Sequence, residues 1–278
     1  MTSNEYLNEV IKKYDINHTY NSTEEQAFNS LKQVVTDWFN SQNTTTNSAF
    51  SLYMYSNRAT VEVQKSGSRA KGTAIKGSSD MDMFLSITDR QNEDTLKNYY
   101  NDIYDFLKQK GFSVRKQNVS LGVKYRGYDI DVVPAKKVNT QSYVRGRERF
   151  NDHYLWSNKH QQRTLTNIQK HIDIVQGSGS KNEIMLVKIW KKQHNLDFPS
   201  IYAELMVIDA LNTKTNDLEK DFFTAIRYIK DNIENKRVID PSNCNNIISN
   251  TLTASEKTAI KKQADEALSA QYWVEIFK

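Results

Sequence analysis

The chain has 278 residues, of which 38% are hydrophobic and 11% aromatic, so it can bury a sizeable core and is not a disordered protein. Nine glycines and three prolines are few for this length and disfavour an all-β protein built on many turns. A net charge of +5 fits ordinary solubility and binding of nucleotides or nucleic acid about equally well. A single cysteine, Cys244, excludes an internal disulfide and a cysteine-based zinc site.

The sequence carries no signal for export or for membrane insertion. Its first residues lack a basic stretch followed by an apolar one, and no segment is apolar enough over a sufficient length to cross a bilayer. We therefore expect a cytoplasmic protein with no membrane partner.

The first half of the chain mixes helical and strand patterns. Ser22 and Glu25 have the spacing of a capping box, and apolar residues recur at helical spacing after them. Between 59 and 63 apolar and polar residues alternate, as on a half-buried strand. In order, we expect a helix ending near Ser41, a polar loop over 42–48, strands at 59–63 and 81–87, a helix over 92–110 closed by Gly111, and a hairpin over 119–133 ending at Pro134.

The second half has helical spacing throughout. From about Leu155 onward, helices are expected over 160–176, 182–194, 200–212, 216–235 and 255–269, with a loop over 240–243. The fold class is therefore α+β. We predict a mixed α/β N-terminal lobe over 1–150, an all-helical lobe over 151–278, and a long N-terminal helix that spans both lobes.

Two aspartates at the start of the second strand are the strongest chemical signal. Residues i and i+2 of a strand point to the same face, so Asp80 and Asp82 project together while Met81 and Met83 face the core. Paired carboxylates repel each other and lose hydration, and a cation between them offsets both costs. Magnesium bound to a triphosphate would supply this cation. The alternative, an Asp-x-Asp that merely caps a strand, is common for such a pair taken alone.

A third carboxylate comes from the hairpin strand. Asp129 and Asp131 again share a face, and Asp131 is flanked by Ile130 and Val132, so we favour it as the deeper residue and place Asp129 at the rim. A two-metal mechanism needs such a group for the ion that activates the attacking hydroxyl. Asp80, Asp82 and Asp131 are therefore predicted as catalytic and metal-binding residues.

A small-residue loop precedes the first aspartate pair. Gly67 and Ser68 follow a strand, and the backbone N–H groups there, together with the Ser68 hydroxyl, are suited to an anion. Gly67 allows close approach because it has no Cβ. An ordinary turn is the commoner role of Gly-Ser alone, and no Walker A lysine follows.

These features together resemble the DNA polymerase-β nucleotidyltransferase superfamily. The stretch 67–82, Gly-Ser-x-x-Lys-Gly-Thr-x-x-x-Gly-x-Ser-Asp-x-Asp, is most similar to the 2′-5′-oligoadenylate synthases and the bacterial cGAS/DncV-like nucleotidyltransferases. The segment 131–135 matches the family's Asp-Val-hydrophobic-Pro-Ala. In the second lobe, 186–192, 198–205 and 240–246 resemble the family's Leu-hydrophobic-Lys-x-Trp helix, Pro-Ser-Tyr-x-x-Glu-Leu helix and Asp-Pro-x-x…Asn-Asn loop.

The resemblance implies a polymerase-β-like catalytic lobe, a helical second lobe and an active site in the cleft between them. The residues it assigns to nucleotide binding are Gly67, Ser68, Ser79, Lys188, Lys192, Ser200 and Tyr202. Lys192 lies one helical turn after Lys188, although a solvated face is an equally good interpretation for it. Ile201 stands where the family often has a base-stacking tyrosine, with Tyr202 one residue later.

The implied activity is a nucleotidyltransferase that joins NTPs into a cyclic or short linear oligonucleotide signal and releases pyrophosphate. Two Mg²⁺ ions are the implied cofactors, with Mn²⁺ as the alternative metal. NTPs are the implied substrates, and the product would act on an effector in bacterial anti-phage (CBASS-type) defence. An activating RNA is kept as a partner to test. We expect a monomer. Transfer to a tRNA 3′ end, a small molecule or a protein, or an RNA-binding protein with a vestigial site, stays open.

Overall fold

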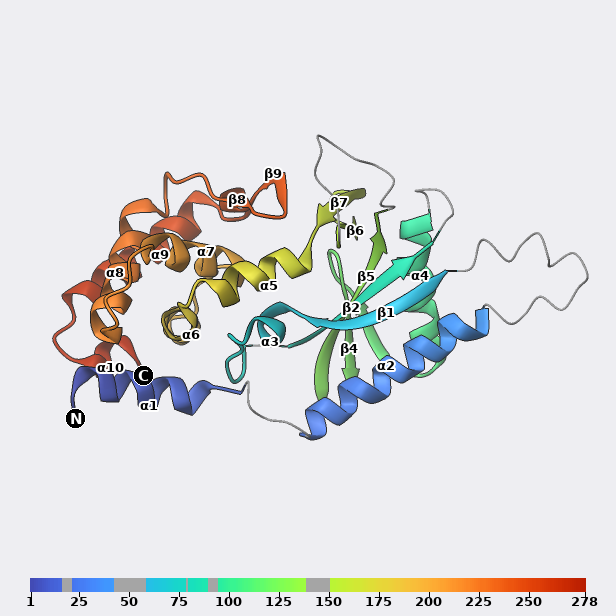
Figure 1. Ribbon diagram of the computed structural model, residues 1–278, viewed down its shortest axis with the longest axis horizontal. Coiled ribbons are helices and arrows are strands. Elements are labelled where there is room, and N and C mark those ends of the chain that lie inside the picture. Colours follow the sequence, from blue (N-terminus) through green and yellow to red (C-terminus); the bar gives the residue numbers. More distant parts are fainter. Residues whose placement is uncertain (17–21, 43–58, 79, 90–94, 139–150) are drawn as a thin grey trace, which may run out of the picture. The chain divides into compact units, whose positions relative to one another are not determined.

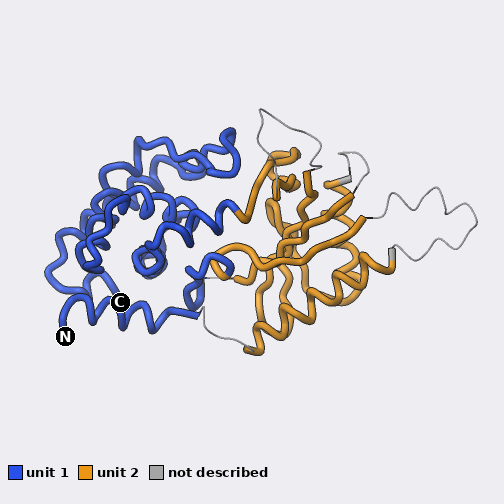
Figure 2. The backbone as a smooth tube through the Cα atoms, viewed as in Figure 1, with its two compact units in different colours: residues 1–18, 70–79, 170–278 blue, residues 19–69, 80–169 orange. Residues whose placement is uncertain are grey.

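The computed structural model describes residues 1–16, 22–42, 59–78, 80–89, 95–138 and 151–278 (Figure 1). The predicted ligand Ser79 lies outside these ranges, and so does the polar loop expected over 42–48, apart from its first residue. The chain divides into two compact units (Figure 2). Residues 1–18, 70–79 and 170–278 form unit 1, and residues 19–69 and 80–169 form unit 2.

Unit 2 is built on a seven-stranded sheet with the main order β1-β2-β5-β4-β3, to which β6 is added beside β5 and β7 beside β6. Its strands are β1 (Thr60–Ser66), β2 (Met81–Thr88), β3 (Ser113–Lys116), β4 (Leu121–Tyr125), β5 (Tyr128–Lys137), β6 (His153–Ser157) and β7 (Gln162–Thr166). Strands β2 and β5 run parallel, and the other pairs in this sheet are antiparallel. The central parallel pair therefore carries both predicted aspartate motifs.

Two helices, α2 (Thr23–Gln42) and α4 (Thr95–Gln109), pack on one face of this sheet (Figure 1). Met81 and Met83 of β2 and Ile130 and Val132 of β5 are buried in the core that these helices close. Because side chains alternate along a strand, the residues between them project to the opposite face. The helix-covered face thus fixes which face the aspartates occupy.

Local signals placed most of these elements correctly. Ser22 Oγ accepts a hydrogen bond of 3.2 Å from the Glu25 backbone N–H at the start of α2. Gly111, at φ 83°, ends α4, and the Phe112 N–H donates back to Leu107 O at 3.0 Å. The β4–β5 turn uses Arg126 and Gly127 at φ 50° and 85°, as a tight hairpin requires.

Two predictions for this unit were wrong. Strand β5 does not end at Pro134 but continues to Lys137. Its antiparallel pairing with β4 stops at Val132 and that with β6 begins at Ala135, so Pro134 occupies an interval where its missing N–H removes no bond on that side. The helix expected over 160–176 is strand β7 in its first part, because pairing of 162–166 with β6 overrides the local helical spacing, and it is a helix only from Ile168 onward.

Unit 1 is mainly helical, with a core formed by side chains of α1, α6, α7, α8 and α9. Its elements are α1 (Ser3–Tyr14), α5 (Ile168–Gly177), α6 (Lys181–Gln193), α7 (Ser200–Ala210), α8 (Leu218–Asn232), β8 (Ile239–Asp240), β9 (Asn243–Ile247), η2 (Ile248–Thr251), α9 (Ala254–Ser269) and α10 (Trp273–Ile276). The short helix α3 (Gly67–Lys71) contains residues of both units. None of the described helices is both long and apolar enough to span a membrane.

The units differ from the predicted lobes of 1–150 and 151–278. The β6–β7 hairpin belongs to the sheet because β6 pairs with β5, so unit 2 extends to residue 169. Helix α1 and the segment 70–79 belong to unit 1, where Ile75 is fully buried and forms a β-bridge with Asp15. Helix α2, which was expected to span both lobes, belongs to unit 2.

The β8–β9 hairpin is held to α5 through one carboxylate. Asp240 accepts hydrogen bonds from His171 Nε2 at 2.7 Å, Ser242 N at 2.8 Å and Asn246 Nδ2 at 3.0 Å. Burial by itself would raise the pKa of Asp240, but the bonds from His171 and Ser242 outweigh it and lower the pKa to about 2.

Asp240→Asn is therefore expected to reduce the free energy of unfolding by about 1–2 kcal/mol at pH 7. Since the pKa is lower in the folded chain, the difference between wild type and variant should be full above about pH 4 and vanish toward pH 2. Urea unfolding at several pH values measures it. Asp265→Asn, at a carboxylate that is 66% exposed, is the control; equal effects of the two substitutions would contradict the assignment.

Candidate active site

A single row of paired residues crosses the sheet of unit 2 and contains two of the predicted carboxylates. Ser66 on β1 pairs with Asp82 on β2, and Asp82 pairs with Asp131 on β5. Asp131 then pairs with Gly122 on β4, and Gly122 with Arg115 on β3. Residues paired in this way share one face of a sheet. The structure thus brings Asp82 and Asp131 together on adjacent strands, on the face opposite α2 and α4.

Gly67 lies directly against one of these carboxylates. Its φ is +60°, and a Cβ added to it would come within 1.8 Å of Asp82 Oδ2. Only glycine permits both the backbone conformation and this approach. The start of α3, where half-buried Ser68 follows Gly67, is therefore held next to Asp82.

The other aspartates lie at the edge of the row. Asp80 and Asp129 are exposed, whereas Asp82 and Asp131 are half-buried. Although Asp80 is exposed, neighbouring protein atoms remove part of its hydration, which raises its pKa, and the negative charge of Asp129 raises it further. Burial likewise raises the pKa of Asp131, with an added contribution from Asp80. The carboxylates therefore act on each other electrostatically, as expected for a site that favours a cation.

In the part of the chain that the structure describes, no three acidic, histidine or cysteine side chains are already gathered around one metal position. The donors in the row are carboxylate oxygens, the hard ligands that Mg²⁺ prefers. Their mutual repulsion favours a divalent ion in the same place. The residues present thus fit Mg²⁺ in chemistry.

The predicted ligands Lys188 and Lys192 lie on α6 in unit 1, where protein groups bind both ammonium groups. Lys188 is 1% exposed and its Nζ donates to Thr73 O at 2.7 Å. Lys192 Nζ donates to Lys76 O at 2.6 Å. Both lysines therefore hold the segment 70–79, which follows the Gly67–Ser68 turn in sequence. Their contact with a nucleotide stays a prediction.

Ser200 and Tyr202 lie at the start of α7 in the same unit. Ser200 Oγ accepts from Lys191 Nζ at 3.3 Å. Tyr202 is fully buried, and its hydroxyl donates to Ile233 O at 3.4 Å. Its ring packs edge-on against Phe198, with the centroids 5.2 Å apart. Tyr202 therefore serves the core of unit 1, and base recognition by it also stays a prediction.

The sequence analysis assigned no role to Glu204, which organises this part of unit 1. Its side chain is fully buried and accepts from Lys71 Nζ at 2.7 Å and from Thr73 Oγ1 at 3.2 Å. Lys188 Nζ lies 3.8 Å from Glu204 Oε1, the oxygen that accepts from Thr73. The available signal was an acidic residue within the otherwise apolar start of α7. Arg115, Gln117 and Gly122 were missed as well, because only strand pairing places them near Asp131.

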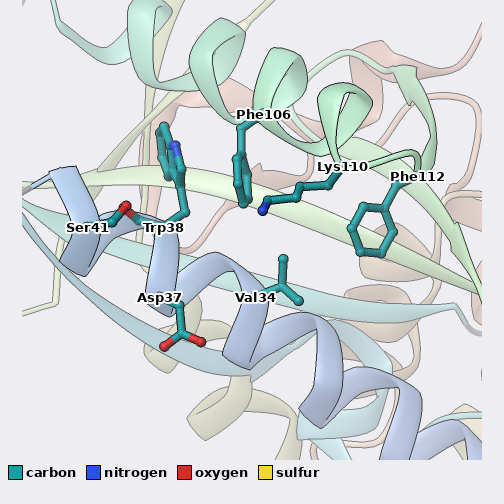
Figure 3. Close-up of a pocket in the computed structure, with 7 residues that line it drawn as sticks. All are labelled: Val34, Asp37, Trp38, Ser41, Phe106, Lys110 and Phe112. Carbon is teal, nitrogen blue, oxygen red and sulfur yellow. The ribbon is translucent and has the colours of Figure 1, made fainter.

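A cavity of about 500 Å³ opens on the helix-covered side of unit 2 (Figure 3). It is lined by Val34, Asp37, Trp38 and Ser41 of α2, Phe106 of α4, and Lys110 and Phe112. The rings of Trp38 and Phe106 stack with centroids 5.1 Å apart. The sheet separates this cavity from the face that carries Asp82 and Asp131, so it is not part of the carboxylate site.

Known proteins with a similar structure share one fold. No protein-family model and no curated protein matches the sequence. Among solved structures, CdnC of Escherichia coli MS115-1 with ATP is 19% identical, with a TM-score of 0.69 and coverage of 99% of this chain and 98% of that one. The CD-NTase CdnG of Bradyrhizobium diazoefficiens, in complex with GTP, is 10% identical, with a TM-score of 0.69 and coverage of 99% and 95%.

A third structure, the cyclic dinucleotide synthase CdnE of Elizabethkingia meningoseptica with GTP and Apcpp, is 14% identical, with a TM-score of 0.64 and coverage of 97% and 100%. These likenesses span nearly the whole of each chain. The chain therefore has the α+β fold of the CD-NTases. The polymerase-β-like fold predicted from the resemblance is confirmed.

The contact between Gly67 and Asp82 gives a direct test of the site. In Gly67→Ala the new Cβ would displace the Asp82 carboxylate and strain the backbone, so affinity for Mg²⁺-ATP should fall at least about tenfold by isothermal titration calorimetry. Gly127→Ala is matched in backbone strain, at φ +85°, but its Cβ meets nothing within 4 Å. Equal losses in the two variants would contradict a specific role of the Gly67 contact.

Glu204→Gln should destabilise the protein without touching the carboxylate row. It leaves two lysines, Lys71 and Lys188, with exposures of 9% and 1% and without their buried counter-charge. The loss should be about 3 kcal/mol in the free energy of unfolding, measured with urea. Glu266→Gln, at a 54% exposed carboxylate, should change it by less than about 0.5 kcal/mol. A comparable small change in Glu204→Gln would show that the buried charges are not coupled.

Proposed function

We propose that this chain is a Mg²⁺-dependent nucleotidyltransferase that joins NTPs into a cyclic or short linear oligonucleotide and releases pyrophosphate. The observation that carries the proposal is the pairing of Asp82 with Asp131 across parallel strands, with Gly67 against Asp82. The fold it shares with CdnC, CdnG and CdnE supports the proposal. One of those proteins is a cyclic dinucleotide synthase.

The metal ligands in this proposal are Asp80, Asp82 and Asp131. Two Mg²⁺ ions, or Mn²⁺ in their place, would neutralise triphosphate charge and make the acceptor hydroxyl more acidic when bound. Asp80 and Asp82 serve the donor side, because Asp82 lies against the Gly67–Ser68 turn that is suited to phosphate oxygens. Asp131 serves the acceptor side, one strand further along the row.

The reaction is an in-line substitution at phosphorus. A ribose hydroxyl oxygen of the acceptor bonds to the α-phosphorus of the donor, the bond from that phosphorus to the bridging oxygen breaks, and pyrophosphate leaves. In this proposal Asp131 receives the hydroxyl proton, because it is the carboxylate on the acceptor side of the row. Positioning and charge stabilisation supply most of the acceleration, as in phosphoryl transfer generally.

Unit 1 contributes the remaining nucleotide-binding residues of the proposal. Lys188 and Lys192 hold the backbone of 70–79, the segment that joins the Gly67–Ser68 turn to Asp80. A further contact of both lysines to donor phosphates, with Ser200 as a hydrogen-bonding partner, is part of the proposal. Ser79 and Tyr202 complete the proposed set.

The biological context is part of the same proposal. The product would be a signal that activates an effector in bacterial anti-phage defence of the CBASS type. The enzyme would act in the cytoplasm as a monomer, and an RNA activator is testable by adding RNA to the assay.

The proposal predicts that purified protein with Mg²⁺ and the four NTPs releases pyrophosphate and forms a phosphatase-resistant oligonucleotide, identified by mass. Asp82→Asn and Asp131→Asn should each lower the rate at least about a thousandfold, because each removes a charge that binds metal or accepts the proton. Asp265→Asn, on α9 in unit 1, is the charge-matched control.

Circular dichroism and urea unfolding establish that the inactive variants are folded. Label from an NTP that appears on added RNA, protein or a small acceptor instead would identify another transferase. Turnover that persists in Asp82→Asn would overturn the proposed site.

A further inference from the structure

Arg115 stands in the carboxylate row although it is two strands away from Asp131. Its partner across β3 and β4 is Gly122, and the partner of Gly122 across β4 and β5 is Asp131. Between the arginine and the aspartate there is therefore a position without a side chain. An arginine side chain is long enough to pass over such a gap and reach the next strand on the same face.

The space above Gly122 is occupied by side chains from outside β4. A Cβ added to Gly122 would lie 2.6 Å from Arg115 Nε and 2.9 Å from Gln117 Nε2. Both distances are shorter than real contacts allow, so even alanine here would displace both side chains. The glycine thus creates the passage by which Arg115 and Gln117 approach Asp131.

Gln117 is oriented toward Asp131 by its own neighbour. Ser120 Oγ donates a hydrogen bond to Gln117 Oε1, which leaves the amide nitrogen on the opposite side. The amide nitrogen, a hydrogen-bond donor, lies over Gly122, which pairs with Asp131. Gln117 thus places a neutral donor beside Arg115 at this point of the row.

Arg115 supplies charge to the same group. Its guanidinium nitrogen Nε lies over Gly122, the partner of Asp131, and the guanidinium is near enough to Asp80 and Asp131 for a favourable charge interaction with each. Arg115 is itself exposed, so its head group is not locked by surrounding side chains. A single cation thus serves carboxylates on two different strands.

We propose that Arg115, passing over Gly122, is a built-in counter-cation of the carboxylate row that competes with free metal ions for Asp80 and Asp131. The inference rests on the proposed function. A divalent ion that arrives alone must displace the favourable charge interaction of Arg115. An ion that arrives on a triphosphate brings anionic oxygens to which the displaced guanidinium can turn. Arg115 therefore makes the site selective for nucleotide-bound metal.

The test measures binding of Mn²⁺ without nucleotide, by electron paramagnetic resonance of the free ion. Arg115→Gln should lower the dissociation constant for Mn²⁺ roughly three- to tenfold, the size expected for one charge near a partly exposed site. Arg115→Lys, which keeps the charge, should remain within about twofold of wild type. With a non-hydrolysable ATP analogue present, the difference between Arg115→Gln and wild type should shrink or reverse.

Gly122→Ala separates position from charge. This variant keeps every charged group but places a methyl where Arg115 and Gln117 now lie, and so moves Arg115 away from Asp131. Like Arg115→Gln, it should therefore tighten Mn²⁺ binding. Gly122 is not at a positive φ, so alanine adds no backbone strain. Lys108→Gln on α4, on the helix-covered side of the sheet, removes one positive charge elsewhere and should leave the Mn²⁺ affinity unchanged.

Tighter binding in both Arg115→Gln and Gly122→Ala, but not in Lys108→Gln, supports the proposal. Wild-type affinity in either of the first two, or an equal gain in Lys108→Gln, overturns it. The proposed function is judged separately: Asp131→Asn should weaken Mn²⁺ binding and abolish product whatever Arg115 does. If neither Mn²⁺ binding nor product responds to Asp131→Asn, the proposed function itself fails.

Discussion

The structure of the candidate site depends on one electrostatic constraint, the placement of Asp82 beside Asp131 on adjacent parallel strands. Two half-buried carboxylates in this arrangement repel each other, and each loses hydration. The register is nevertheless fixed, because Met81, Met83, Ile130 and Val132 are buried on the other face. A shift of one residue would bury the aspartates and expose these side chains. The hydrophobic core of unit 2 thus holds the two charges together.

Glycines flank this pair on both sides of the row. Gly67 lets a backbone turn approach Asp82, and Gly122 lets side chains from β3 and its flank approach Asp131. In each case the missing Cβ is what admits the neighbouring group. The two openings differ in the chemistry they admit: backbone N–H groups suited to phosphate on the Asp82 side, and a guanidinium with an amide on the Asp131 side.

In unit 1, charged side chains hold one backbone segment in place. Lys188 and Lys192 each donate to a carbonyl of 70–79, while Glu204 binds Lys71 and Thr73 of the same segment. The ends of this segment continue directly into the Gly67–Ser68 turn and Asp80. The two lysines predicted to bind donor phosphates thus bind protein carbonyl groups in this structure. Such partners come from segments more than a hundred residues away, and no local pattern could predict them.

The sequence by itself determined the elements with strong local signals: α2 with its Ser22 cap, α4 with Gly111, the turn at Arg126 and the aspartates on β2 and β5. The resemblance of its motifs to the polymerase-β nucleotidyltransferases also implied the fold. The sequence could not determine that residues 162–166 form a strand, because pairing with β6 decides this. Only the tertiary structure placed Arg115 and Gly122 in one row with Asp131, since their alignment depends on the register of three strands. Periodicity reports which face a residue occupies, whereas the neighbours on that face are set by pairing across the sheet.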